Sequence, residues 1–219
     1  GDGVERFSGL KITQRLVRPQ KWDELMGGKR FVTLDRLNTP SVAEGTENIV
    51  AIAVVYERSL PKTTANGNRF AHWSFTDLAF PQPRLMTLLL HGQAFDTWGE
   101  GTENRIETGA IFAVLNPVPL ADRNSEEKRS GDEGRVTAKV SYATQLVHLG
   151  TCPSLGLCSC KKKDGFPCSM PCDRDRGPLV CFYHTMHKDA QQVKRFQQAQ
   201  AAARGTGGQQ EGGIFVVQE

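Results

Sequence analysis

Six cysteines and two histidines gather in one short region of this chain. All six cysteines lie between Cys152 and Cys181, and His184 and His187 follow closely. Thiolates and imidazoles are the ligands that zinc prefers, and four of them complete a tetrahedral site. A disulfide framework would be spread more evenly along the chain. The clustering therefore predicts a metal site in a reducing compartment.

The spacing favours one set of four ligands, Cys158, Cys168, Cys181 and His184, in the pattern Cys-x9-Cys-x12-Cys-x2-His. A Cys-x2-His pair at the start of a helix can supply two ligands from one turn. No open coordination position with a nearby general base is evident, so a structural zinc is favoured over a catalytic one. The segment has few apolar residues, so we expect the metal to contribute much of its folding free energy.

Other ligand sets stay open. Cys152, Cys160 or Cys172 could replace one of the chosen cysteines, and His187 could replace His184. The same four residues are also just enough for a second zinc. The single residue between Cys158 and Cys160 disfavours that reading, because it is too short a loop for both thiolates to bind comfortably.

A run of three lysines, Lys161–Lys163, lies between the first two proposed ligands, and Arg174 and Arg176 follow the second. A lysine run is often only a solvated turn. On a loop tied by metal, however, fixed cations suit phosphate groups, and the contacts should weaken with salt. Arg69 and Phe70 would add a cation and a stacking ring if their faces open into a groove.

The overall charge is small, and its distribution is uneven. The net charge is +3, but residues 1–150 are balanced while residues 151–205 carry an excess of basic side chains. Any affinity for a polyanion must therefore come from local placement of a few cations. Enzymatic readings are disfavoured because the chain has no Gly-rich phosphate loop and no evident acid pair.

The hydropathy and the start of the chain add two expectations. No apolar run approaches the ~20 residues of a transmembrane helix, so we expect a soluble protein. The sequence opens at Gly1 without an initiator Met and has no secretory signal, so we expect it to be a piece of a longer protein.

Five predicted strands precede the cysteine-rich region. The first is a nearly continuous β-branched run, typical of a strand buried on both faces. A short helix over 93–98 falls between the third and fourth strands, and an Asn-Gly pair at 66–67 predicts a hairpin. Five strands with a helix in this place suit a mainly β, five-stranded OB-type barrel, although another small barrel or half of a sandwich stays open. The predicted strands are 49–56, 70–78, 85–91, 110–116 and 135–140.

The rest of the chain divides around this barrel. We expect an N-terminal arm over 1–48 with a short helix at 20–27, and the barrel itself over 49–148. A CCCH zinc finger with a following helix, from about Tyr183 to Arg204, would occupy 149–205. Residues 206–219 are Gly- and Gln-rich and predict a flexible tail. Residues 38–48 and 121–134 read as polar loops.

Several stretches of this chain resemble the internal domain of the minichromosome maintenance protein ten family. They are FSGL at 7–10, NG at 66–67, Trp73, DL at 77–78, LLLHG at 88–92, Trp98, VLNP at 114–117, GLC at 156–158, KKKDGFPC at 161–168 and CFYH at 181–184. The resemblance spans about residues 5–200, and the cysteine-rich portion is its most specific part.

The resemblance implies a function as well as a fold. It implies an OB-fold on a CCCH zinc finger that binds single-stranded and duplex DNA, with Cys158, Cys168, Cys181 and His184 as ligands. It implies a non-enzymatic nuclear factor for replication initiation and elongation that acts with the replicative helicase, polymerase alpha–primase and the sliding clamp. A protein-interaction scaffold with weak DNA binding is the alternative. The chain departs from the family at His91, where relatives tend to carry Phe.

Overall fold

The computed structural model of the chain describes residues 2–39, 42, 48–120 and 135–186. Residues 1–181 form one compact unit, and a second unit begins at Phe182. Within the second unit, residues 182–186 are described and are helical. The rest of the expected helix, the tail at 206–219, the loop at 121–134 and most of the loop at 38–48 lie outside the described residues.

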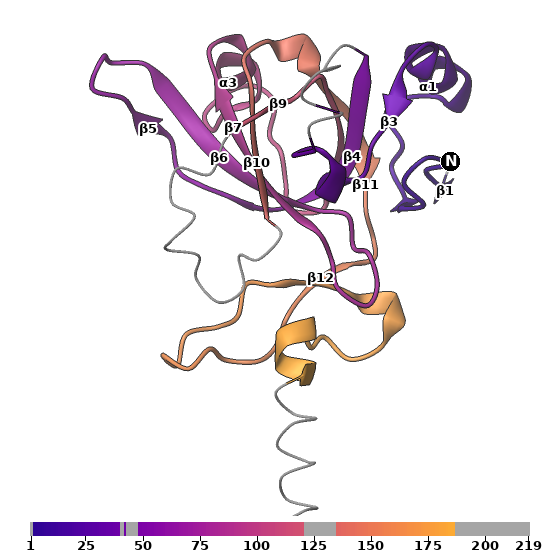
Figure 1. Ribbon diagram of the computed structural model, residues 1–219, viewed down its shortest axis with the longest axis vertical. Coiled ribbons are helices and arrows are strands. Elements are labelled where there is room, and N and C mark those ends of the chain that lie inside the picture. Colours follow the sequence, from indigo (N-terminus) through magenta and orange to yellow (C-terminus); the bar gives the residue numbers. More distant parts are fainter. Residues whose placement is uncertain (1, 40–41, 43–47, 121–134, 187–219) are drawn as a thin grey trace, which may run out of the picture. The chain divides into compact units, whose positions relative to one another are not determined.

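Seven strands of the first unit form the main path of one curled sheet (Figure 1). The strand order is β11–β8–β4–β6–β7–β10–β9, in which β7 and β10 pair in parallel; off this path, β3 also pairs in parallel with β4. Strand β9 directly follows β8 in the chain. Because β8 pairs with β4 and β9 pairs with β10, the β8–β9 segment connects the two ends of the sheet, which therefore curls toward a barrel. This is the predicted OB topology. The bounds are β4 Ile49–Arg58, β6 Arg69–Thr76, β7 Leu85–His91, β8 Ala110–Leu115, β9 Val118–Pro119, β10 Val136–Val140 and β11 Leu146–Thr151.

The interior of the curled sheet is a core of aromatic and aliphatic side chains. Trp73, Phe75 and Phe112 are fully buried, and the Trp73 and Phe112 ring centroids lie 5.5 Å apart in an edge-to-face arrangement. The short helix α3, Gln93–Trp98, adds Phe95 to this core. Its Trp98 indole donates to the carbonyl of Ala143 in the 3₁₀ turn η2, Ala143–Gln145. The predicted helix at 93–98 is therefore confirmed.

A second apolar core covers the outer face of β4. Alternate residues of that strand, Val50, Ile52 and Val54, face away from the barrel interior and are completely or almost completely buried. The N-terminal arm covers them with Ile12 and Trp22, among other residues. Burial on both faces explains the continuous β-branched run and confirms that prediction. The arm contains β1 Gly3–Val4, β2 Lys11–Ile12, α1 Pro19–Met26, β3 Arg30–Phe31 and the 3₁₀ turn η1 Leu34–Arg36.

A buried carboxylate organises the start of the arm. Glu5 has no exposed surface. Its side chain accepts hydrogen bonds from the Trp22 indole at 2.9 Å and from the Ser8 backbone N–H and hydroxyl at 2.7 and 2.6 Å. Buried charges are stable only when they are hydrogen-bonded in this way. The FSGL stretch is thus a tight turn wrapped around one carboxylate, and the positive φ of Gly9, 75°, belongs to that turn.

The predicted elements agree closely with the structure, which also contains strands that were not predicted. All five predicted strands form, α1 matches the helix expected at 20–27, and β5, Lys62–Thr63, makes the predicted hairpin with β6. Strand β11 was not predicted, and it lies on β8 while also contacting the arm. At Gly150 a β-carbon would lie 2.8 Å from the carbonyl oxygen of Thr13, so the close crossing of the arm requires glycine there.

Among the described residues, none of the helices is both long and apolar enough to cross a membrane.

Candidate metal centre and nucleic-acid interface

Four predicted ligands come together in the structure. The Sγ atoms of Cys158, Cys168 and Cys181 and a ring nitrogen of His184 all lie within 4.8 Å of one another. Tetrahedral zinc with Zn–S bonds of about 2.3 Å separates its sulfur ligands by about 3.8 Å, so this spacing fits one ion at the centre. The three cysteines are buried. The arrangement is compatible with a metal site of closed, structural type.

The backbone around these cysteines forms a small, well-bonded scaffold. Strands β12, Leu155–Leu157, and β13, Pro171–Asp173, pair antiparallel. Just beyond them, the backbone N–H of Cys158 donates to the carbonyl of Met170 at 2.9 Å. The backbone N–H of Cys181 points at the Sγ of Cys158, 3.3 Å away. Such a contact stabilises a thiolate and therefore suits a metal-bound sulfur.

The other three cysteines have different surroundings. Cys152 is buried beneath the arm, and burial raises the pKa of its thiol. Cys172 is buried beside the cluster; burial and the neighbouring Cys158 and Cys168 sulfurs raise the pKa of its thiol to about 12. Among the described residues, the one grouping of ligand atoms close enough to share an ion excludes Cys152, Cys160 and Cys172. His187 lies outside the described residues, so a second zinc stays untested.

The lysine run lies on a tight loop between the first two ligands. Lys161, Lys162 and Lys163 are all exposed. The loop is closed by a bridge between Lys161 and Pro167 and by backbone hydrogen bonds from Lys162 to Phe166 and from Cys168 to Cys160. The ends of this loop carry two of the candidate ligands, Cys158 and Cys168, and these hydrogen bonds hold its backbone. Three exposed lysines on such a loop are candidate phosphate contacts.

The other predicted DNA contacts are spread over the unit. The Arg69 guanidinium lies over the Phe95 ring, 4.9 Å from its centroid. Arg174 donates from Nε to the carbonyl of Leu155. Arg176 pairs with Asp173 at 3.0 Å and stacks on Phe80, 5.1 Å from its centroid. Because each of these arginines has a partner within the protein, a phosphate would have to compete for it.

A half-exposed face on β6, β7 and β10 is the second candidate surface. The register places Phe70 opposite His91 and His72 opposite Leu89, and Leu89 also lies opposite Lys139. Phe70 is half-buried and makes an edge-to-face contact with His72, with their centroids 5.4 Å apart. Trp73, on the same strand, belongs to the interior core, so it is not a stacking platform. His91 shares a hydrogen bond of 2.9 Å with the Ser141 hydroxyl.

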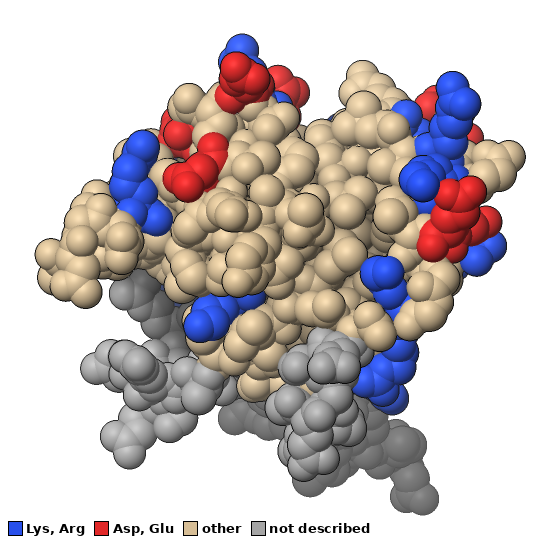
Figure 2. Space-filling view, turned by 90° about the horizontal axis from the view of Figure 1, so that it is seen from above, with Lys and Arg blue, Asp and Glu red and all other residues tan. Residues whose placement is uncertain are grey.

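Charges of both signs mix around the rim of the face that Figure 2 shows, and the centre of that view is uncharged. No broad basic field is visible there. The mixed charges of this face are consistent with the small net charge of +3.

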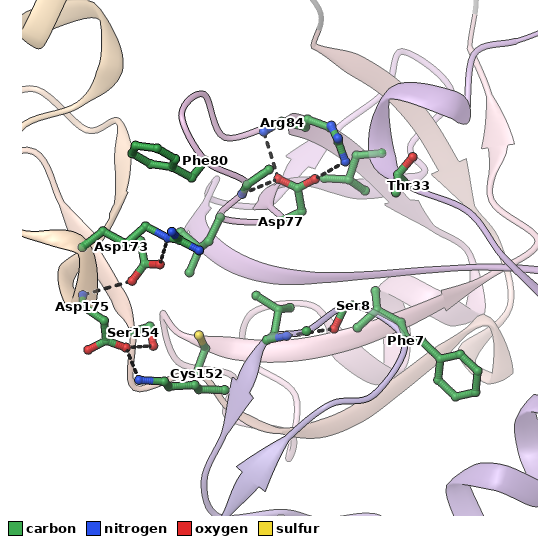
Figure 3. A pocket seen from close by; sticks show the side chains of 18 of the residues that line it. Phe7, Ser8, Thr33, Asp77, Phe80, Arg84, Cys152, Ser154, Asp173 and Asp175 are labelled. Carbon is green, nitrogen blue, oxygen red and sulfur yellow. Dashed lines mark hydrogen bonds and ion pairs between the residues drawn. The ribbon is translucent and has the colours of Figure 1, made fainter.

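A pocket of about 610 Å³ lies where the arm, the loop after β6 and the cysteine-rich segment meet (Figure 3). Its cations face carboxylates: Arg84 pairs with Asp77 at 3.1 Å, and Lys11 pairs with Asp175 at 2.9 Å. Asp175 also accepts from the Ser154 hydroxyl, and together these contacts lower the pKa of its carboxyl. Because the positive charges that line the pocket are paired with carboxylates, the pocket is better interpreted as a contact region between segments of the chain than as an anion-binding site. Sequence reasoning missed it because Lys11 and Asp175 are far apart in the chain.

A family model described as "MCM10 OB-fold" matches residues 6–145, which is more than half of the chain. The chain belongs to this family. The match covers the arm and barrel strands through β10. The structure shows what two of the motifs shared with the MCM10 family do, DL at 77–78 and VLNP at 114–117. Asp77 closes the loop to Arg84, and Asn116 adopts a positive φ while its side-chain oxygen accepts from the backbone N–H of Ile49.

Curated MCM10 proteins are similar over more than the barrel. "Protein MCM10 homolog" of Homo sapiens is 26% identical over 195 residues, covering 87% of this chain and 20% of that protein. "DNA replication licensing factor mcm10" of Schizosaccharomyces pombe is 28% identical, covering 84% of this chain and 29% of that protein. The mouse "Protein MCM10 homolog" is 24% identical over 194 residues, with coverage of 87% and 20%. The chain thus spans less than a third of each of these relatives.

Proposed function

We propose that this chain is a non-enzymatic DNA-binding core of a replication factor, in which a metal-tied basic loop holds the phosphates of single-stranded DNA. The observation that carries the proposal is the position of Lys161–Lys163, exposed on a hydrogen-bonded loop between two ligands of the Cys₃His cluster. Membership of the MCM10 OB-fold family supports it, because OB barrels often bind single strands. Duplex DNA, which offers the same phosphates, is a second ligand.

The metal in this proposal is one structural zinc. Three thiols and one imidazole within 4.8 Å of one another form a donor set that suits zinc. Four protein ligands fill a tetrahedral site and leave no open coordination position for a substrate. Cys158, Cys168, Cys181 and His184 would hold the ion, and bound zinc would supply folding free energy to the loop rather than chemistry.

The barrel contributes a sequence-tolerant surface. Phe70 on β6 is half-exposed beside His72 and offers a ring for base stacking, while Arg69 is exposed at the start of that strand. Stacking on an aromatic ring accepts every base, so we expect little sequence preference. Arg174 and Arg176 would be secondary contacts, because DNA must compete with their present partners.

The cellular role follows the relatives. The fission yeast relative is named a DNA replication licensing factor. On that basis we infer that this chain acts in the nucleus, in replication initiation and elongation, with the replicative helicase, polymerase alpha–primase and the sliding clamp as partners. In this role the core would hold unwound strand near the helicase.

Salt titration of single-strand binding tests the proposal. Three neutralised phosphates at ~0.7 each give a log–log slope of about −2 from the loop alone, and further contacts extend it to about −4. The variant with Lys161, Lys162 and Lys163 changed to Glu should lose most of the affinity and reduce the slope by about 2, while metal content stays the same.

The matched control reverses three exposed cations on the arm, Arg18, Lys21 and Arg30. It changes the net charge equally, so it should bind nearly as the parent does if local placement matters. Equal losses in both variants would show a general charge effect, and absence of binding by the parent at low salt would refute the proposed function.

A protein-interaction scaffold is the alternative, and the neutral pocket supports it. Because Lys11, Arg84 and Arg176 are each paired with a carboxylate, that surface has little phosphate affinity. A parent protein that binds primase or helicase subunits but no DNA would favour this alternative.

A further inference from the structure

An exposed aromatic ring lies among the lysines of the metal-tied loop. The Phe166 side chain is 68% exposed, although burying a phenylalanine is normally favourable by about 1.5–3 kcal/mol. It follows Lys161–Lys163 by three positions and precedes Pro167 and the ligand Cys168. The ring is therefore within a few residues of three ammonium groups and of the metal site.

Isolated exposed hydrophobic residues are common on protein surfaces, so exposure alone means little. Phe80, for example, is equally exposed, but the Arg176 guanidinium lies over its ring. No such ring or cation contact is found for Phe166 within the described residues. Most of the side chain is accordingly open to a ligand.

The backbone around Phe166 is fixed. Its N–H donates to the Asp164 side chain at 3.0 Å, and its carbonyl accepts from the Lys162 N–H at 2.8 Å. The Gly165 N–H donates to the Lys162 carbonyl at 3.0 Å. This turn requires the positive φ of residue 165, 85°, which glycine adopts without steric cost. A ring on a pre-organised turn loses little conformational entropy on binding, which favours it as an anchor.

We propose that Phe166 stacks against an unpaired nucleobase of the strand whose phosphates contact Lys161–Lys163. The inference rests on the proposed function and assigns a base contact to the loop. Cations with an interleaved aromatic ring are the combination that single-stranded nucleic acids require, because phosphates and bases alternate along the strand. A duplex, whose bases are already stacked, would gain much less from this ring.

The contact is tested by comparing the binding of two single-stranded DNA oligonucleotides of equal length and charge, one with normal bases and one abasic throughout. Stacking on an aromatic residue contributes ~1–3 kcal/mol per base, which corresponds to a factor of about 5 to 160 in affinity. Phe166→Ala should weaken binding of the normal strand by that factor and leave the abasic strand and the salt slope unchanged. Phe166→Trp should restore binding and show fluorescence quenching by the bound strand.

Phe166→Leu is the matched control, since it keeps an apolar side chain but cannot stack. Binding by Phe166→Leu at parental strength, or equal losses for the normal and abasic strands, would overturn the stacking contact. Parental binding of the normal strand by Phe166→Ala would also overturn it, and would point to a protein pocket as the ring's partner. In each of these outcomes Lys-dependent binding persists, whereas absence of all binding by the parent refutes the proposed function itself. Metal content near one ion per chain verifies that the variants are folded.

Discussion

Replacement of Glu5 by Ala should detach the arm from the barrel at a large cost in stability. The Trp22 indole N–H is buried and donates to the Glu5 carboxylate, so it would lose its acceptor without access to water. An unsatisfied buried donor costs ~1–3 kcal/mol, and loss of the charge-assisted bonds from Ser8, which is half-buried, adds ~1–2 kcal/mol. We therefore expect the free energy of unfolding to fall by about 2–5 kcal/mol.

Equilibrium unfolding in urea, followed by tryptophan fluorescence, measures this loss. At ~2–4 °C per kcal/mol for a unit of this size, the melting temperature should fall by roughly 5–20 °C. Glu5→Gln keeps one carbonyl oxygen that can accept from the indole, so it should cost about half as much. Glu24→Ala, at an exposed position on α1, is the control for loss of an acidic side chain. An unfolding free energy for Glu5→Ala within ~0.5 kcal/mol of the parent would refute the reasoning.

Two further predictions concern the metal and pH. A strong chelator, or Cys168→Ala, should release the metal and abolish the lysine-dependent part of DNA binding, whereas Cys172→Ala should keep one ion per chain. Metal analysis and binding titrations check both expectations. Loss of metal in Cys172→Ala would mean that the ligand set is wrong. Burial lowers the pKa of His148 from its usual 6.5, because its ring stacks on Phe112 inside the unit. The unfolded chain therefore binds more protons, so the free energy of unfolding should fall as the pH drops below about 6.5. His148→Gln should flatten this dependence in denaturant titrations at pH 5 to 7, and an unchanged slope would contradict the assignment.

The barrel strands were predictable from the sequence because their burial pattern is local. The run at 49–56 has no charged residue, and only a strand covered on both faces suits it. The identity of its outer cover was not predictable. It depends on contacts such as that between Glu5 and Trp22, which join segments that carry no shared pattern.

The candidate site was predictable to a similar degree. Candidate metal ligands are recognisable by residue type and spacing, so the sequence favours Cys158, Cys168, Cys181 and His184 over other sets, and the structure brings these four together. The residues that pair with the lysines and arginines could not be predicted, because these pairs depend on which side chains the fold brings together. Nothing in the sequence near Arg176 indicates that the Phe80 ring lies under its guanidinium. The exposure of Phe166 could not be predicted, because an exposed ring and a buried one look alike in a sequence.

The pairing of the arm with β11 has a mechanical consequence. Thr13 and Thr151 exchange backbone hydrogen bonds of 2.8 and 2.9 Å, and Lys11 bonds to Asp175. The first and last segments of residues 1–181 are thus fastened to each other. Tension applied to the two ends of this unit would load these few bonds first, so we expect the arm to separate from β11 while the longer ladders between barrel strands still hold.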